Sequence, residues 1–180
     1  MWRAIDRIAR VIVYCKMIQR KYGLILYIII ALLAMTNFLW QPCLFIRGNG
    51  AGLAMVPVMG ELPFSISFLH SVQKTPVEEN LVAMGDGRGF RLLSTKYQSF
   101  GVGLPFLESE GSFRQEGNFY VFEGMDRSFS QLSVRTGVGT KLVIRVAGRE
   151  YRLYEQFAPG TRIDLFVVPV YEYIWKGAHP

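Results

Sequence analysis

The sequence predicts an all-β protein, a single antiparallel β-sandwich or partly open barrel of about eight strands, preceded by one N-terminal transmembrane helix. An uncharged apolar stretch lies near the N-terminus, and short runs that alternate apolar and polar residues fill most of the rest. Turns that contain glycine or proline separate these runs. We therefore expect a basic segment (1–21), a transmembrane helix (22–40), a connector (41–61) and a β domain (62–180).

The composition excludes several classes of protein. A chain of 180 residues suits one ordinary domain with a small addition, and 51% hydrophobic residues exclude a disordered chain. Five units of the net charge of +6 lie in residues 1–21, which carry six basic residues and one acidic residue. The remaining 14 basic and 13 acidic residues leave the body nearly neutral, so we expect no nucleic-acid binding.

The helix rests on residues 23–40, GLILYIIIALLAMTNFLW, which are 18 residues without a charge. A bilayer-spanning helix needs about 17–25 residues. A cleaved signal peptide and a buried helix of a soluble protein are the alternatives, but no small-x-small cleavage pattern follows and no partner helix is evident. We favour a permanent anchor in the inner (cytoplasmic) membrane. The basic flank then places the N-terminus in the cytoplasm and the β domain in the periplasm or outside the cell.

The sequence patterns of the two segments that flank the helix predict their structure less clearly. The spacing of Ile5, Ile8 and Ile12 among basic residues fits an amphipathic helix on membrane lipid, and a solvated basic tail fits equally well. Repeated glycines and Pro57 make residues 41–61 a predicted connector.

The β domain follows from alternation and turns. Strands are expected near 62–72, 77–84, 89–97, 112–122 (with an internal turn), 129–136, 140–147, 149–157 and 161–169. The aromatic segment 171–175 is expected to pack on the sheet or to contact a partner.

One predicted hairpin carries the most informative polar residues. If its loop is 73–76, then His70 lies opposite Glu79, on the apolar face of Phe64, Ile66 and Phe68. Such a pair can be a structural hydrogen bond, a ligand clamp or a general base.

A second candidate is the loop around Gly101-Val102-Gly103-Leu104-Pro105. It lacks the third glycine of a dinucleotide fingerprint and the Gly-Lys-Ser/Thr of a phosphate loop. A tight structural loop and a loop that contacts a ligand or partner both remain open.

No catalytic group can be named beyond this, because no nucleophile accompanies His70. We expect no enzyme, no metal and no cofactor. In the anchor topology Cys15 and Cys43 lie on opposite sides of the membrane, which leaves Cys43 a free thiol at the outer interface.

Two motifs resemble those of a small bacterial family of domains of unknown function. They are His70-Ser71-Val72 with Thr75-Pro76-Val77-Glu78-Glu79, and Gly101-Val102-Gly103-Leu104-Pro105. Members of that family are often encoded beside TRAP transporters of the TAXI type. The resemblance covers about residues 62–170 and implies a transporter accessory protein, without assigning a reaction.

We therefore expect a membrane-anchored accessory protein that binds the TRAP membrane subunit or its solute-binding protein. The alternative is a small-ligand-binding module with a polar pocket at His70 and Glu79. The candidate binding residues are His70, Ser71, Lys74, Thr75, Pro76, Glu78, Glu79, Gly101, Gly103 and Pro105.

Overall fold

The computed structural model describes residues 2–99 and 111–175, with side chains from residue 19 onward. It divides the chain into two units, residues 1–40 and 41–180. The first unit is the helix α1 (Trp2–Trp40). Its part from Gln19 to Trp40 has 22 residues, a mean hydropathy of 2.1 and no burial within the protein. Because a helix rises about 1.5 Å per residue, this part is long enough to cross the hydrocarbon core of a bilayer.

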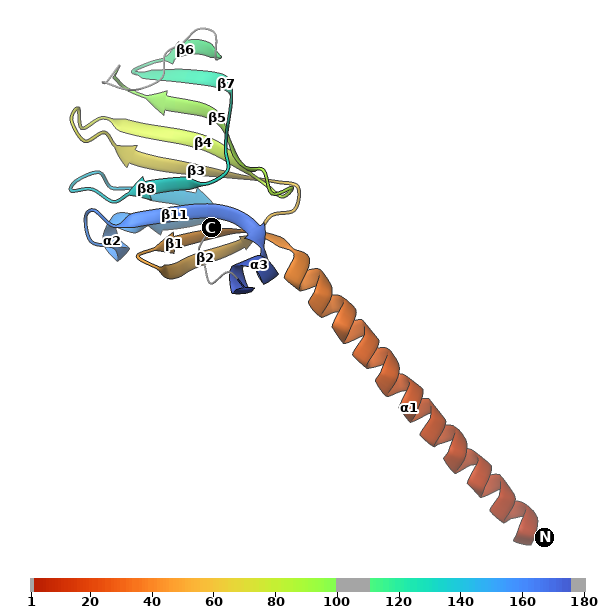
Figure 1. The fold of residues 1–180 in the computed structure, drawn as a ribbon. Coiled ribbons are helices and arrows are strands. Elements are labelled where there is room, and N and C mark those ends of the chain that lie inside the picture. Colours follow the sequence, from red (N-terminus) through yellow and green to blue (C-terminus); the bar gives the residue numbers. More distant parts are fainter. Residues whose placement is uncertain (1, 100–110, 176–180) are drawn as a thin grey trace. The chain divides into compact units, whose positions relative to one another are not determined.

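The second unit is β-rich, as the sequence predicts, and forms two antiparallel sheets (Figure 1). The first sheet has the order β2-β1-β11-β8 and the second β10-β9-β3-β4-β5-β7-β6. The strands are β1 (Pro42–Gly48), β2 (Ala51–Pro57), β3 (Glu61–Leu69), β4 (Pro76–Met84), β5 (Gly89–Tyr97), β6 (Ser112–Glu116), β7 (Phe119–Phe129), β8 (Leu132–Arg135), β9 (Val143–Val146), β10 (Arg149–Arg152) and β11 (Arg162–Pro169).

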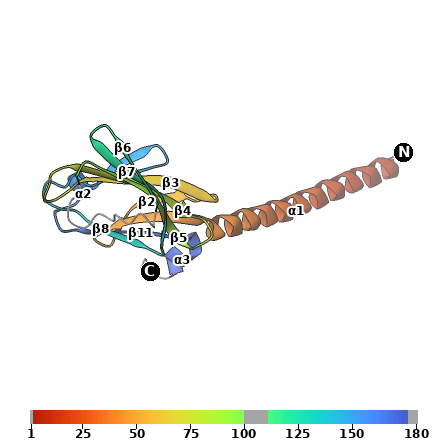
Figure 2. The same cartoon turned by 90° about the horizontal axis from the view of Figure 1, so that it is seen from above.

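The core lies between the inner faces of the two sheets, which makes the fold sandwich-like and not closed. Leu44 and Ile46 of β1 and Leu165 of β11 belong to the same buried cluster as Phe64 and Phe122 of the larger sheet. Figure 2 shows the domain from above, with β3 of the larger sheet and β11 of the smaller sheet on opposite sides of the domain. Along strands such as β3, alternation sends every second side chain into this cluster, which is the pattern expected of an antiparallel sandwich.

The expected connector is wrong, because residues 41–61 contain β1 and β2. Cys43, Leu44, Phe45 and Ile46 are all buried, so β1 is a central strand covered on both faces. Such a strand has a continuous apolar run and not an alternating one. Of the glycines that suggest a connector, Gly50 lies in the β1–β2 turn, where it and Asn49 adopt positive φ, and Gly60 lies in the turn before β3. Gly48 and Gly52 lie within the two strands.

Two short helices occupy the regions where the sequence predicts a continued strand and an aromatic tail. The expected strand at 149–157 ends at Arg152, and α2 (Leu153–Gln156) follows. The tail forms α3 (Val170–Trp175). The Tyr173 ring stacks on Phe45 with centroids 4.0 Å apart, so α3 packs on the outer face of the four-stranded sheet.

Candidate functional site

The β3–β4 hairpin places the predicted polar residues. Phe64 and Ile66 of β3 are buried, and the register pairs them with Leu81 and Glu79 of β4. Glu79 therefore lies on the core face of the sheet, as the alternation predicts. The adjacent carboxylate, Glu78, pairs with Ser67 and lies on the opposite, outer face.

The expected pairing of His70 with Glu79 is wrong. Leu69 pairs with Pro76, so the turn spans 70–75 and Glu79 lies opposite Ile66. Two bonds close this turn: the His70 N–H donates to the Thr75 carbonyl (2.8 Å), and the Lys74 N–H donates to the His70 carbonyl (2.9 Å). Lys74 adopts a positive φ of 55°. These local bonds compete with the β ladder, which ends earlier than the sequence pattern indicates.

His70 and Glu79 nevertheless line the same cavity, the end pocket. This cavity of about 420 Å³ opens at the end of the sandwich where β3 finishes. Its lining comes from β3, the β3–β4 turn, β4, β8 and the segment that leads into β9. The lining residues are Ile66, Phe68, Leu69, His70, Ser71, Glu79, Val134, Arg135, Thr140 and Leu142. An apolar cavity with a few polar groups is the usual form of a small-molecule site.

Glu79 is the most unusual group in the end pocket. Burial raises the pKa of its carboxyl above the ordinary value. Its cross-strand neighbour on the other side, Thr95, is buried and directs its hydroxyl to the Met125 sulfur at 3.8 Å. Within residues 19–99 and 111–175, no hydrogen bond or ion pair reaches the Glu79 carboxylate. The carboxylate is therefore open to a ligand or water in the cavity.

The His70 ring is held by its own turn. Its Nδ1 accepts a hydrogen bond from the Gln73 N–H at 3.3 Å. An accepting Nδ1 carries no proton, so the neutral ring carries its proton on Nε2 and offers a donor there. The end pocket therefore combines a donor nitrogen with a carboxylate.

The opposite wall is fixed by loop contacts that the sequence does not reveal. The Leu69 N–H donates to the Thr140 carbonyl at 2.6 Å, which ties the end of β3 to the segment before β9. The Thr140 hydroxyl in turn bonds to the Gly137 carbonyl at 3.0 Å. The expected strands at 129–136 and 140–147 leave a turn at 137–139, but no sequence signal links that turn to His70, some seventy residues earlier.

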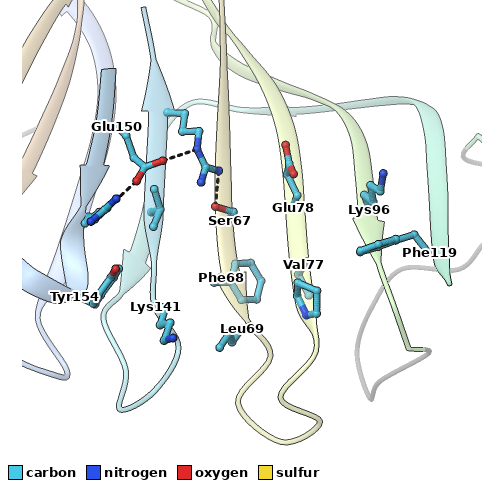
Figure 3. Close-up of a pocket in the computed structure, with 14 residues that line it drawn as sticks. Ser67, Phe68, Leu69, Val77, Glu78, Lys96, Phe119, Lys141, Glu150 and Tyr154 are labelled. Atoms are coloured by element: carbon cyan, nitrogen blue, oxygen red, sulfur yellow. Dashed lines mark hydrogen bonds and ion pairs between the residues drawn. The ribbon is translucent and has the colours of Figure 1, made fainter. Parts of the chain in front are cut away.

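A second concavity, the outer groove, lies on the outer face of the seven-stranded sheet (Figure 3). It has a volume of about 610 Å³. Its lining residues are Ser67, Phe68, Leu69, Pro76, Val77, Glu78, Lys96, Phe119, Lys141, Val143, Arg145, Glu150, Arg152 and Tyr154. Four of these are basic and two acidic, so the groove is net positive although the β domain is nearly neutral.

Glu150 organises the charges at one side of the outer groove. Its carboxylate pairs with two guanidinium groups, Arg145 at 2.9 Å and Arg152 at 2.7 Å. Dashed lines in Figure 3 mark these interactions at the labelled Glu150. Arg145 also donates to the Ser67 hydroxyl at 2.9 Å. The hydrogen bonds that Arg152 and Arg145 donate to its carboxylate hold the pKa of Glu150 below its ordinary value. Across the groove, Lys96 pairs with Glu116 at 3.4 Å and lies over the Phe119 ring.

The sequence-predicted site residues thus separate. His70, Ser71 and Glu79 line the end pocket, whereas Pro76 and Glu78 line the outer groove. Lys74 and Thr75 lie in the turn between them and line neither. Gly101, Gly103 and Pro105 lie outside the described residues.

The described part of the chain contains no group of three or more His, Cys, Asp or Glu side chains placed to hold a metal ion. Cys43 is free, and it is 1% exposed within β1.

Comparison with known proteins gives one match. The family described as "Domain of unknown function (DUF1850)" matches residues 64–153, which is half of the chain. The match contains every residue that lines the end pocket and all but Tyr154 of the outer groove. No curated protein matches the chain. No solved structure matches it either.

Proposed function

This chain belongs to the DUF1850 family, and from that premise we propose that it is a membrane-anchored, extracytoplasmic accessory protein of a TRAP-type (TAXI) solute transporter. It acts by binding the transporter's membrane subunit or its solute-binding protein. The transporter class comes from the resemblance of the two motifs at residues 70–79 and 101–105 to a family encoded beside such transporters.

The observation that carries the anchor is the exposed apolar helix joined directly to a folded domain. The segment Gln19–Trp40 has no burial within the protein, and β1 begins at Pro42. Gln41 already belongs to the β domain, because its side chain donates to the Val58 carbonyl at 3.2 Å. A retained anchor is favoured because no small-x-small cleavage pattern follows the apolar stretch. The basic flank before the helix favours a cytoplasmic N-terminus.

The outer groove is our proposed partner surface. Pro76 and Glu78, two residues of the first motif, line it, and its charge is net positive. Complementary charge guides association and selects partners, so an acidic surface on the transporter subunit fits this groove.

The test is affinity purification of the full chain from native membranes at native expression. Transporter subunits should be recovered with the wild type. Arg145→Glu, which reverses a charge in the groove, should reduce their recovery, and Arg149→Glu is the matched control because this exposed arginine does not line the groove. Repeated recovery of the intact chain without transporter subunits would refute the proposal.

A second candidate function, small-ligand binding in the end pocket, is favoured by one observation. Glu79 is a carboxylate without a partner among the described side chains, and it faces a cavity that His70 also lines. Unpaired ionisable groups in cavities are typical of binding sites.

We expect ligands with an apolar part and a hydrogen-bond donor for Glu79, with n-butylammonium as the first probe. It should raise the melting temperature of the full chain in detergent, and Glu79→Gln should abolish this shift while Glu78→Gln retains it. A shift that survives in Glu79→Gln would exclude the end pocket as the site.

A further inference from the structure

Three segments of the β domain meet where the chain leaves α1. The Gln41 carbonyl accepts a hydrogen bond from the Val170 N–H at 3.2 Å, at the start of α3. The Gln41 side chain donates to the Val58 carbonyl, and the Val58 N–H donates to the Pro42 carbonyl at 2.9 Å. Gln41 follows the apolar helix directly in the sequence. The start of α3 and the turn after β2 are therefore fixed close to the chain's exit from that helix, whatever the angle between the two units.

Both segments carry large apolar side chains that are exposed. Met59 is 84% exposed, Ile174 66% and Trp175 89%. We call these three side chains the α3 patch. Exposed apolar groups that gather in one place usually mark a surface that contacts a partner or a membrane. Tryptophan in particular is enriched at the headgroup level of bilayers, where its ring is partly apolar and its N–H is hydrated.

The orientation of the α3 patch is set by packing beneath it. The Tyr173 ring stacks on Phe45 with an interplanar angle of 9°, and on Phe166 with centroids 6.2 Å apart. This stack fixes which side of α3 faces the sheet, so Ile174 and Trp175 remain on the outside. The neighbouring turn is attached to Gly60 by the Gly85 N–H at 2.8 Å. Its Asp86 and Arg88 pair with each other, so they add no net charge next to the patch.

We propose that Met59, Ile174 and Trp175 form a second membrane contact, inserting into the headgroup region of the leaflet from which the anchor emerges. This inference rests on the proposed function only in that α1 must be a retained membrane anchor. The occupant is lipid, because hydrogen bonds hold Val170, where α3 begins, and Val58, which precedes Met59, at the first residue after the bilayer-spanning segment.

The contact has a consequence for the two candidate sites. A single connection at Gln41 would leave the β domain free to swivel, whereas a second contact restricts it. Strand β3 begins after the turn that contains Met59 and ends at Leu69, on the rim of the end pocket. The end pocket thus lies at the end of the domain opposite the α3 patch, so a domain held by this patch presents the pocket away from the lipid.

The experiment uses the full chain reconstituted in phosphatidylcholine vesicles, with Trp175 as the sole tryptophan after Trp2→Phe and Trp40→Phe. Brominated acyl chains should reduce Trp175 fluorescence by roughly twofold, and aqueous iodide should reduce it little. The matched control adds Trp175→Phe and Val138→Trp. Val138 is 81% exposed in the turn after β8, at the opposite end of the domain. The Val138→Trp variant should show the reverse pattern.

Extraction of the same vesicles at alkaline pH separates the possible failures. If the chain is released, α1 is not an anchor, and both the proposed function and this inference fail. If the chain stays in the membrane but iodide quenches Trp175 as strongly as it quenches the Val138→Trp variant, the second contact is refuted and the anchor stands. If the chain stays and bromine quenches Trp175, the inference is supported.

Discussion

Replacing Glu79 by glutamine should make the protein more stable at neutral pH. The ionised carboxylate lies on the core face without a partner among the described side chains. A buried polar group without a partner costs about 1–3 kcal/mol, and partial access to the end pocket places Glu79 at the low end. We therefore expect Glu79→Gln to raise the free energy of unfolding by about 1 kcal/mol, or the melting temperature by about 3 °C.

The pH dependence of this difference follows from the raised pKa. Between the unfolded-state pKa and the higher folded-state pKa, the native protein binds more protons at Glu79 than the unfolded chain does. Wild-type stability at this residue therefore falls as pH rises through that window. The advantage of Glu79→Gln should be full above the folded-state pKa and should disappear below the unfolded-state pKa.

Thermal unfolding of the full chain in detergent, followed by near-ultraviolet circular dichroism from pH 4 to 8, measures both effects. Glu78→Gln is the matched control, because this carboxylate lies on the outer face, and it should change stability by no more than about 0.5 kcal/mol. Loss of stability in Glu79→Gln at neutral pH would refute the reasoning, because it would mean that the carboxylate has a favourable partner.

Three further changes test the packing of the domain. Gly89→Ala should lower the free energy of unfolding in urea by about 3 kcal/mol, because its Cβ would lie 2.2 Å from a backbone oxygen of β7 and its φ is +88°. Gly87→Ala is the control: its φ is +82° but open space surrounds it, so it should cost only about 1 kcal/mol. Cys43 should resist alkylation by iodoacetamide until the protein unfolds, because it is 1% exposed and burial raises the pKa of its thiol. Rapid alkylation of the folded chain would contradict this burial. Tyr173→Ala should lower the free energy of unfolding by about 2 kcal/mol in the same urea assay, because it removes the ring stack on Phe45. Tyr173→Phe keeps the ring and should be nearly neutral. Equal losses of stability in the two variants would assign the effect to the hydroxyl instead.

Three central strands of the larger sheet could be predicted from their alternation. Residues 61–69, 76–84 and 89–97 form strands close to their expected bounds, because alternation of apolar and polar side chains is a local signal. β1 was not predictable in this way. Both of its faces are covered, one by the core and one by Tyr173, so its residues do not alternate.

For the candidate site, the sequence predicted the face on which a side chain lies but not the residues it contacts. The sequence identified Glu79 as a carboxylate on the core face, and the register confirms that face. The expected contact with His70 depended on the position of the turn. The turn is centred two residues earlier than expected, so Glu79 lies opposite Ile66 and not opposite His70. Lys96 and Arg145 of the outer groove belong to strands far apart in sequence, so no spacing rule could group them with Glu78.

The sequence by itself determined properties that depend on nearest neighbours: one apolar helix with its charges on one side, an antiparallel β domain, and the face on which each side chain lies. A period of two residues is enough to fix a face. The tertiary structure decided the register, the inclusion of β1 and β2, and the segments that line each cavity. Those depend on hydrogen bonds between distant residues, such as that from Leu69 to Thr140, and their geometry is set only when the sheets pair.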